Sequence, residues 1–230
     1  MSQTQELTPE RSAWLAWLPV LATALFYSFP PDFQSHQALQ FLPQAVAYAA
    51  LAWWAARNSD IAVRFGLRPP QFAQGLRWGI VTGLVLGATN AGIVLWMVPR
   101  LGYDIAFLRA TPHAQIPPAL MLPWFIAAIA VFVEVNFRGF LLGRLLALTE
   151  QMVPALPVPL AAGLAIGASA LAFSFDPFMV ATFHHLHWIA VWDGLIWGLL
   201  WMWLRNLYVP IVAHAVEVMV MYSVIRTVLA

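Results

Sequence analysis

The sequence predicts an all-α protein, a polytopic bundle of about seven transmembrane helices. Of its 230 residues, 62% are hydrophobic and only 9% are charged, and its mean hydropathy is +0.76. A soluble domain carries about 25% charged residues, so this chain has too few to cover a surface that faces water. The bilayer is the solvent that fits such a composition, and a helix that spans it needs about 20 apolar residues.

Seven apolar runs supply the expected helices, at about 12–29, 38–56, 76–99, 118–147, 156–175, 187–204 and 207–228. The breaks between them carry the Pro, Gly, Asn and Asp residues of turns. We find no soluble domain, low-complexity tract or internal repeat, and expect residues 1–230 to form a single integral-membrane domain. The first ten residues lack the basic start of a cleaved signal peptide, which favours a retained first helix.

Arginine placement predicts the orientation of the bundle. The first connection has no basic residue, whereas four arginines surround the second, namely Arg57, Arg64, Arg68 and Arg77. The positive-inside rule then places the second connection and the N-terminus in the cytoplasm and the C-terminus outside. Arg144 and Arg205 fall on the cytoplasmic side with it, while Arg100 and Arg109 fall outside.

Composition also excludes several classes of partner and site. The net charge is +1 and the basic residues form no cluster, so nucleic acid is not an expected partner. The absence of Cys excludes disulfides and Cys-ligated metals. Small residues four apart instead predict close helix packing, at Gly75, Gly79, Gly83 and Gly87, and again at the pairs Gly139/Gly143, Gly163/Gly167 and Gly194/Gly198.

Ionisable residues inside apolar runs are the candidate functional residues. A charge at the bilayer centre costs about 3 kcal/mol, so such residues point inward and need partners. They are Glu134, Arg138, Asp193, His214 and Glu217. Glu134 and Arg138, in "VFVEVNFRGFLLGRL" (131–145), are four apart and share a helix face. Either the two neutralise each other and hold a neighbouring helix, or Arg138 keeps Glu134 ionised beside a water-filled cavity.

His214 is expected at a depth similar to that of Glu134. It lies about 9 Å along its helix from Tyr208, at 1.5 Å per residue, and the fourth run brings Glu134 to the cytoplasmic half. A carboxylate and an imidazole that meet can poise a water molecule for general-base attack. They can equally form a buried hydrogen-bonded pair.

The segment "FHHLHW" (183–188) offers three histidines in four residues. It predicts either a metal or catalytic cluster or an interfacial segment that hydrogen-bonds near the membrane surface, with Trp188 in an aromatic belt. His184 and His187 share a face only if the segment is helical. Asp176, followed by Pro177, is most simply a residue at a helix end.

Four stretches together carry a family resemblance: "EVNFRGFLLGRL", "GASALAFSFD", "DGLIWGLLW" and "RNLYVPIVAHAVEV". In order, spacing and sequence they resemble the CPBP family, the CAAX-protease and bacteriocin-processing (Abi) proteins, over a CPBP-like core at 120–228. The resemblance implies an intramembrane glutamic-type endopeptidase. A glutamate and a second-motif histidine would activate water, and last-motif residues would stabilise the oxyanion. Glu134 and Arg138 match the second glutamate and the arginine of the first motif, and His214 matches the last-motif histidine.

The chain departs from that family pattern at three positions. Val133 stands where the first glutamate is expected, Pro177 where alignment from Phe173 places the second-motif histidine, and Val218 where the last motif has Asn or Asp. A literal Phe-x-x-x-His occurs instead at Phe183–His187. Either Glu134 is the base, with His187 or Asp176 folding back toward it, or the site is inactive.

Two functions therefore remain open from the sequence. The first is an intramembrane endopeptidase that hydrolyses a peptide bond of a membrane-associated protein through water activated by Glu134. The second is a catalytically inactive scaffold or an accessory subunit of a larger membrane complex. A transporter is a third option, since buried charges are also expected there. The expected partners are membrane lipid and a membrane-associated peptide or protein, and the expected setting is a bacterial inner membrane.

We expect no cofactor and no metal. A catalytic zinc takes three protein ligands, whereas the positions that match the family supply one histidine and one glutamate.

Overall fold

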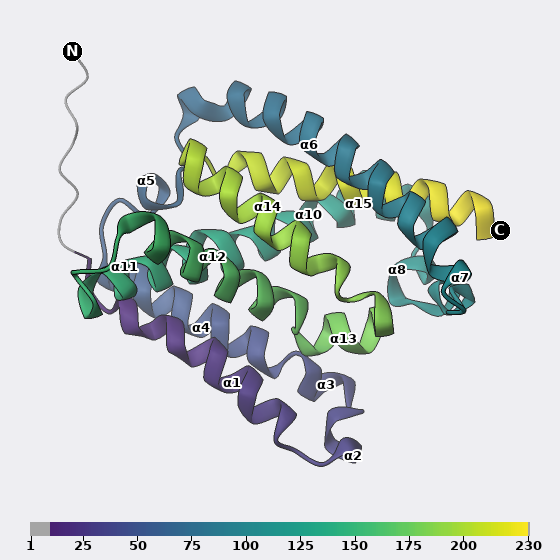
Figure 1. Ribbon diagram of the computed structural model, residues 1–230, viewed down its shortest axis with the longest axis horizontal. Coiled ribbons are helices and arrows are strands. Elements are labelled where there is room, and N and C mark those ends of the chain that lie inside the picture. The colour runs from purple at the N-terminus through teal and green to yellow at the C-terminus, as the bar shows by residue number, and fades with distance from the viewer. Residues whose placement is uncertain (1–9, 230) are drawn as a thin grey trace.

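The computed structural model describes residues 10–229, and every regular element in that part of the chain is a helix (Figure 1). The all-helical prediction is confirmed. Each of the seven apolar runs contains a helix: α1 (Trp17–Tyr27), α4 (Leu42–Arg57), α6 (Phe72–Gly92), α10 (Ile126–Glu134), α12 (Val158–Ser174), α14 (Ile189–Leu204) and α15 (Tyr208–Leu229).

Fewer of these helices than the predicted seven are long and apolar enough to cross a membrane. In residues 10–229 three continuous helical stretches qualify, Ile61–Arg100, Pro118–Met152 and Tyr208–Leu229. A fourth is added if Val158–Ser174 and Pro177–Leu186, which are bent by 53°, form one span. The others are short because turns cut the apolar runs. The 16 residues of α14 extend only about 24 Å at 1.5 Å per residue, against a hydrocarbon core of about 30 Å.

Six of these seven helices pack in pairs (Figure 1). α6 lies along α15, α12 lies along α14, and α1 lies along α4. The α6/α15 pair forms one side of the molecule and the α1/α4 pair the opposite side, with α12 and α14 between them. α10 packs one face against α15 and leaves Val131 and Phe132 exposed on the other. It continues without a break into a π-helical segment, η6 (Val135–Leu142), and then into α11 (Gly143–Met152).

The glycine stripe of α6 explains why α6 and α15 lie so close. A Cβ atom on Gly83 would lie 2.6 Å from the carbonyl oxygen of Ala213, and one on Gly87 would lie 2.8 Å from Cβ of Val220. Only a residue without a side chain permits this approach. The same prediction is wrong for Gly163 and Gly167, because no atom of the described chain lies within 4 Å of a Cβ built at either position.

Two of the arginines that were predicted to share one side of the membrane do share one end of the bundle. Glu10 forms ion pairs with Arg144 and, at 3.8 Å, with Arg64. Trp54 donates its indole N–H to the same carboxylate at 3.1 Å, and the Arg144 guanidinium lies 4.0 Å from the Trp54 ring centroid. This cluster joins the start of the described chain to the second connection and to α11.

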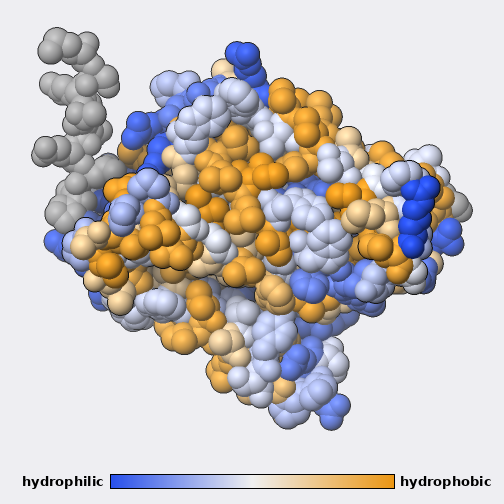
Figure 2. Space-filling view, in the orientation of Figure 1, coloured by the Kyte–Doolittle hydropathy of each residue, from blue (hydrophilic) through white to orange (hydrophobic). Residues whose placement is uncertain are grey.

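Large apolar side chains are exposed along the outward faces of the long helices. Leu21 on α1, Val85 on α6 and Trp203 on α14 are each more than half exposed. Figure 2 shows hydrophobic side chains over much of the visible face, with the hydrophilic ones toward its margins. Such a surface suits contact with lipid, in agreement with a membrane protein.

Candidate active site

Glu134, Arg138 and His214 meet in the interior of the bundle. Arg138 donates from Nη1 to Oε1 of Glu134 at 3.1 Å, and the same oxygen lies 2.8 Å from Nδ1 of His214. Glu134 and Arg138 are fully buried and His214 is 6% exposed. Glu134 ends α10, Arg138 lies in η6, and His214 lies on the second turn of α15. The contact therefore joins the fourth and seventh apolar runs, as their depths predict.

The hydrogen bond to Glu134 fixes the orientation and the tautomer of His214. When Glu134 is ionised, its carboxylate only accepts hydrogen bonds, so Nδ1 of a neutral His214 then carries the proton and Nε2 is left as an acceptor. The imidazole also stacks on Trp197, with ring centroids 4.5 Å apart and planes 17° from parallel. One ring nitrogen is thus bound to the carboxylate, while the ring face is held by α14.

Aromatic rings and small residues surround the Arg138 guanidinium. Its central carbon lies 4.8 Å from the Phe173 ring centroid and 5.0 Å from that of Trp197, a cation–π arrangement that stabilises a buried charge. A Cβ atom on Gly194 would lie 3.1 Å from Nη2 of Arg138. Gly194, in "DGLIWGLLW", is therefore needed to make room for the guanidinium.

A second buried polar cluster lies on α6, α14 and α15. The amide nitrogen of Asn90 donates to both carboxylate oxygens of Asp193, at 3.0 and 3.2 Å, and to Oε1 of Glu217 at 2.7 Å. The oxygen of the Asn90 amide accepts from the indole of Trp192 at 3.1 Å. Sequence reasoning found the two acids and missed Asn90. Its signal was an uncharged amide inside the apolar run 76–99, which a search for charges passes over.

A cavity of about 860 Å³ lies beside both clusters. His214, Asp193 and Glu217 form part of its wall, and the rest of the wall is largely apolar. Neither Glu134 nor Arg138 is among the lining residues. The imidazole of His214 therefore faces the cavity, and the carboxylate that orients it lies behind it.

The two neighbouring residues Val133 and Glu134 face different surroundings. Val133 lines the cavity, whereas Glu134 does not, because successive helix residues point about 100° apart. The position where the family resemblance expects the first glutamate is thus in the cavity wall and holds a valine. Asn136, which the sequence analysis did not select, also lines the cavity, and its Oδ1 atom is buried with no hydrogen-bond partner in the described chain.

Asp176 lines the same cavity but acts as a helix cap. Its Oδ1 atom accepts from the backbone N–H groups of Phe178, at 3.0 Å, and Met179, at 3.4 Å, which begin α13 (Pro177–Phe183). It also accepts from the Gln44 amide at 2.9 Å. No hydrogen bond joins Asp176 to Glu134 or His214 among the described residues. The simplest interpretation of the sequence, a residue at a helix end, describes it well.

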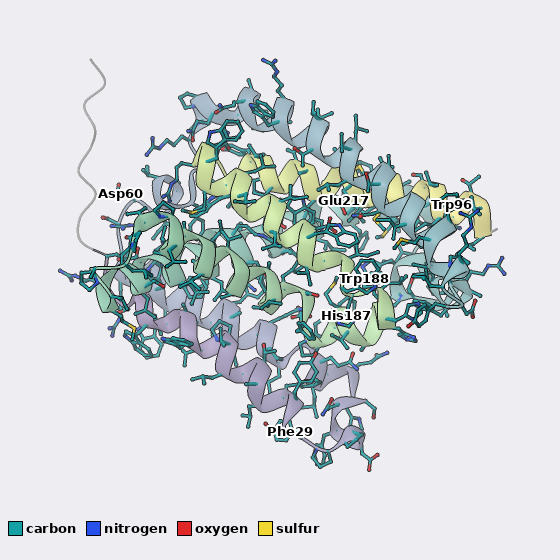
Figure 3. The ribbon with its side chains drawn as sticks, in the orientation of Figure 1. Phe29, Asp60, Trp96, His187, Trp188 and Glu217 are labelled. Carbon is teal, nitrogen blue, oxygen red and sulfur yellow. The ribbon has the colours of Figure 1, made fainter. Side chains whose placement is uncertain are left out.

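His187 is not in the cavity wall. It lies at the turn before α14, apart from Glu217 on α15, which does line the cavity (Figure 3). Nδ1 of His187 is 2.6 Å from the carbonyl oxygen of His184, and the carbonyl of His187 accepts from Ser174. Its ring packs edge-on against Phe175 at 5.2 Å. Within residues 10–229 no group of three His, Asp or Glu residues is arranged to hold a metal ion.

Comparisons with models of protein families, with curated proteins and with solved structures find no match to this chain. The resemblance to the CPBP family therefore depends on the motif residues alone.

Proposed function

We propose that this chain is an intramembrane endopeptidase of the CPBP type, which hydrolyses a peptide bond of a membrane-associated protein. One observation carries the proposal: His214 faces a large cavity while the buried Glu134 carboxylate accepts its Nδ1 proton. A base that a third group orients is the arrangement by which enzymes activate a nucleophile. The sequence suggested water activated directly by Glu134, and the geometry favours His214 as the group that touches the water.

The reaction can be written with the chain's own residues. A water molecule hydrogen-bonded to Nε2 of His214 transfers its proton to that nitrogen as its oxygen attacks the peptide carbonyl carbon. The C–N bond then breaks as the imidazolium returns the proton to the leaving amine. The products are a carboxylic acid and an amine. Glu134 stabilises the imidazolium and holds the tautomer, as the buried carboxylate does in a catalytic triad. His214 is the catalytic residue, and Glu134 and Arg138 are positioning residues.

The membrane setting belongs to the proposal. We place the protein in a bacterial inner membrane with its N-terminus in the cytoplasm and its C-terminus outside, with all seven apolar segments embedded. The two arginines that share Glu10 support the assignment of Arg64 and Arg144 to one side. The positive-inside rule makes that side the cytoplasm.

The test compares cleavage products of the full chain with those of matched variants. Each form is produced in bacterial inner membranes, and new protein termini in the total membrane protein are measured by mass spectrometry. His214→Gln should lower the yield of specific termini by about 10²-fold or more, since general-base catalysis contributes 10²–10⁴-fold. Glu134→Gln should lower it in the same direction. His187→Gln, the same change outside the cavity, should leave it unaltered. Equal cleavage by all four forms would refute the endopeptidase.

The second candidate is a catalytically inactive scaffold or an accessory subunit of a membrane complex. It is favoured by Val133, which occupies the cavity wall where the resemblance expects a carboxylate, and by Pro177 at the second motif. In that case no specific termini appear with any form, and Glu134→Gln instead changes assembly. Blue native gels of solubilised membranes would then show a complex that the Glu134→Gln variant loses and the His187→Gln variant keeps.

A further inference from the structure

One face of α15 forms a continuous wall of the cavity. The lining residues on this helix follow one another at alternating spacings of three and one, which places them on a single face. Those that matter here are His214, Val218, Met221, Tyr222, Ile225 and Arg226. From His214 to Arg226 the helix advances twelve residues, about 18 Å. The cavity is therefore elongated, with the acid–histidine contact at one end and an arginine at the other.

The middle of this elongated cavity is apolar and opens sideways. Ile129 on α10 and Met179 on α13 line it together with the α15 face. Phe132 and Phe41 also line it, yet they are 62% and 44% exposed. A wall residue that is this exposed lies at a mouth. The mouth lies between the outward face of α10, which carries Phe132, and the start of α4, which Phe41 precedes.

Two arginines mark the far end of the cavity. Arg226 donates to the carbonyl oxygen of Ala114, at 3.3 Å, and to the hydroxyl of Tyr222, at 3.0 Å. Arg109 lies in η4 (Ala106–Ala110), which packs against α15, and its carbonyl oxygen accepts from the side chain of Gln115, the residue next to Ala114. Both side chains are exposed and both line the cavity. Among residues 10–229 no carboxylate forms an ion pair with either of them.

We propose that this cavity binds one anionic phospholipid, with its phosphate on Arg109 and Arg226 and an acyl chain along the α15 face toward His214. The length fits, because one leaflet contributes about half of a 30 Å hydrocarbon core and the cavity wall runs about 18 Å. The charge fits, because guanidinium groups bind phosphate through paired charge-assisted hydrogen bonds. An acyl chain needs no hydrogen bonds from the apolar middle, and it can enter from the bilayer through the side opening.

The site does not depend on the proposed peptidase activity. A bound tail would end near His214, in the space that a polypeptide substrate would need. The lipid would then compete with such a substrate, and its binding can be measured without any turnover.

The test uses native mass spectrometry of the detergent-solubilised full chain. The delipidated protein is mixed with micelles that contain either phosphatidylglycerol or phosphatidylcholine of the same acyl composition. We expect one phosphatidylglycerol to be retained at least 10-fold more tightly than phosphatidylcholine. The variant Arg109→Gln/Arg226→Gln should abolish that preference. The variant Arg57→Gln/Arg68→Gln removes the same charge from exposed positions outside the cavity and should keep it.

A third variant tests whether the acyl chain of the lipid occupies the middle of the cavity. Met221→Trp places a larger side chain in the middle of the cavity and should lower retention of both lipids. The preference for phosphatidylglycerol should remain, because Arg109 and Arg226 are unchanged. Circular dichroism checks that each variant remains helical. Equal retention of the two lipids by the wild type, or equal loss of preference in the two double variants, would overturn the proposal. So would a bound peptide in place of the lipid in the protein as first purified.

Discussion

His214 and the histidines of the 184–187 segment differ in what their rings contact. His214 is a single histidine in an apolar helix, and its Nδ1 atom is bound to a buried carboxylate while the ring faces a cavity. The three others are close together in the sequence. His184 stacks on Phe107 at 4.5 Å, His185 stacks on Tyr103 at 4.7 Å, and His187 contacts a backbone carbonyl.

A high density of histidines in the sequence is therefore a weaker guide to a functional site than the free-energy cost of burying a single histidine in an apolar helix. A charged or polar group inside the bilayer needs a partner, so a lone histidine in an apolar helix predicts a partner on another helix. Histidines at a membrane interface can meet water, and their rings are free to pack on aromatic neighbours. The conspicuous cluster thus packs a surface turn, while the inconspicuous residue lines the cavity.

The largest expected effect on stability comes from breaking the buried Glu134–Arg138 pair beside His214. Arg138→Leu leaves the Glu134 carboxylate buried without its guanidinium, which should cost about 3–5 kcal/mol of stability. Chemical unfolding in mixed micelles measures it. Adding Glu134→Gln to the same chain should recover part of the loss, because the unpaired charge is then removed. Arg68→Leu, at an exposed position, should change stability by less than about 0.5 kcal/mol. A similar loss from Arg68→Leu would mean that the buried pair has no special role.

A smaller effect is expected from crowding the same site. A Cβ atom on Gly194 would lie 2.9 Å from Ala170 and 3.1 Å from Nη2 of Arg138, so Gly194→Ala should cost about 1–3 kcal/mol. Gly163→Ala is the matched control, because no atom of the part of the chain that the structure describes lies within 4 Å of the added Cβ. That variant should be neutral or slightly more stable, since Ala is the better helix former. The two midpoints of thermal unfolding compare the sites directly, and equal shifts would contradict the close packing at Gly194.

The smallest effect concerns another histidine of the cavity wall, His113, which packs on Phe183 with ring centroids 5.6 Å apart. Burial, and then the nearby charge of His214, lower the pKa of His113 below its ordinary value of 6.5. Below pH 6.5 the unfolded chain therefore binds this proton more readily than the folded chain, and stability falls as the pH falls. Thermal unfolding in nanodiscs between pH 7.5 and 5.5 should show this decrease. His113→Gln should weaken the dependence, and His36→Gln, at an exposed position, should not.

The sequence predicted the helices well because hydrophobicity and length dominate in lipid. All seven apolar runs contain helices, and the glycines of α6 pack on α15 as their spacing indicates. The number of spanning helices was overestimated, because composition does not reveal where a turn interrupts an apolar run. Gly163 and Gly167 have the same spacing as the α6 glycines, yet a Cβ built at either would meet no atom of residues 10–229 within 4 Å. Spacing shows that two residues share a face, and only the neighbouring helix decides what that face meets.

By itself, the sequence determined that the chain is helical, that lipid suits its surface, and that Glu134 and Arg138 share one helix face. Those properties follow from local composition and from the period of the α-helix. Only the tertiary structure decided that Val133 faces the cavity while Glu134 lies behind His214, that Asn90 joins Asp193 and Glu217, and that His187 lies apart from all of them. Such contacts depend on how helices distant in the sequence rotate and cross, and no local pattern specifies that rotation.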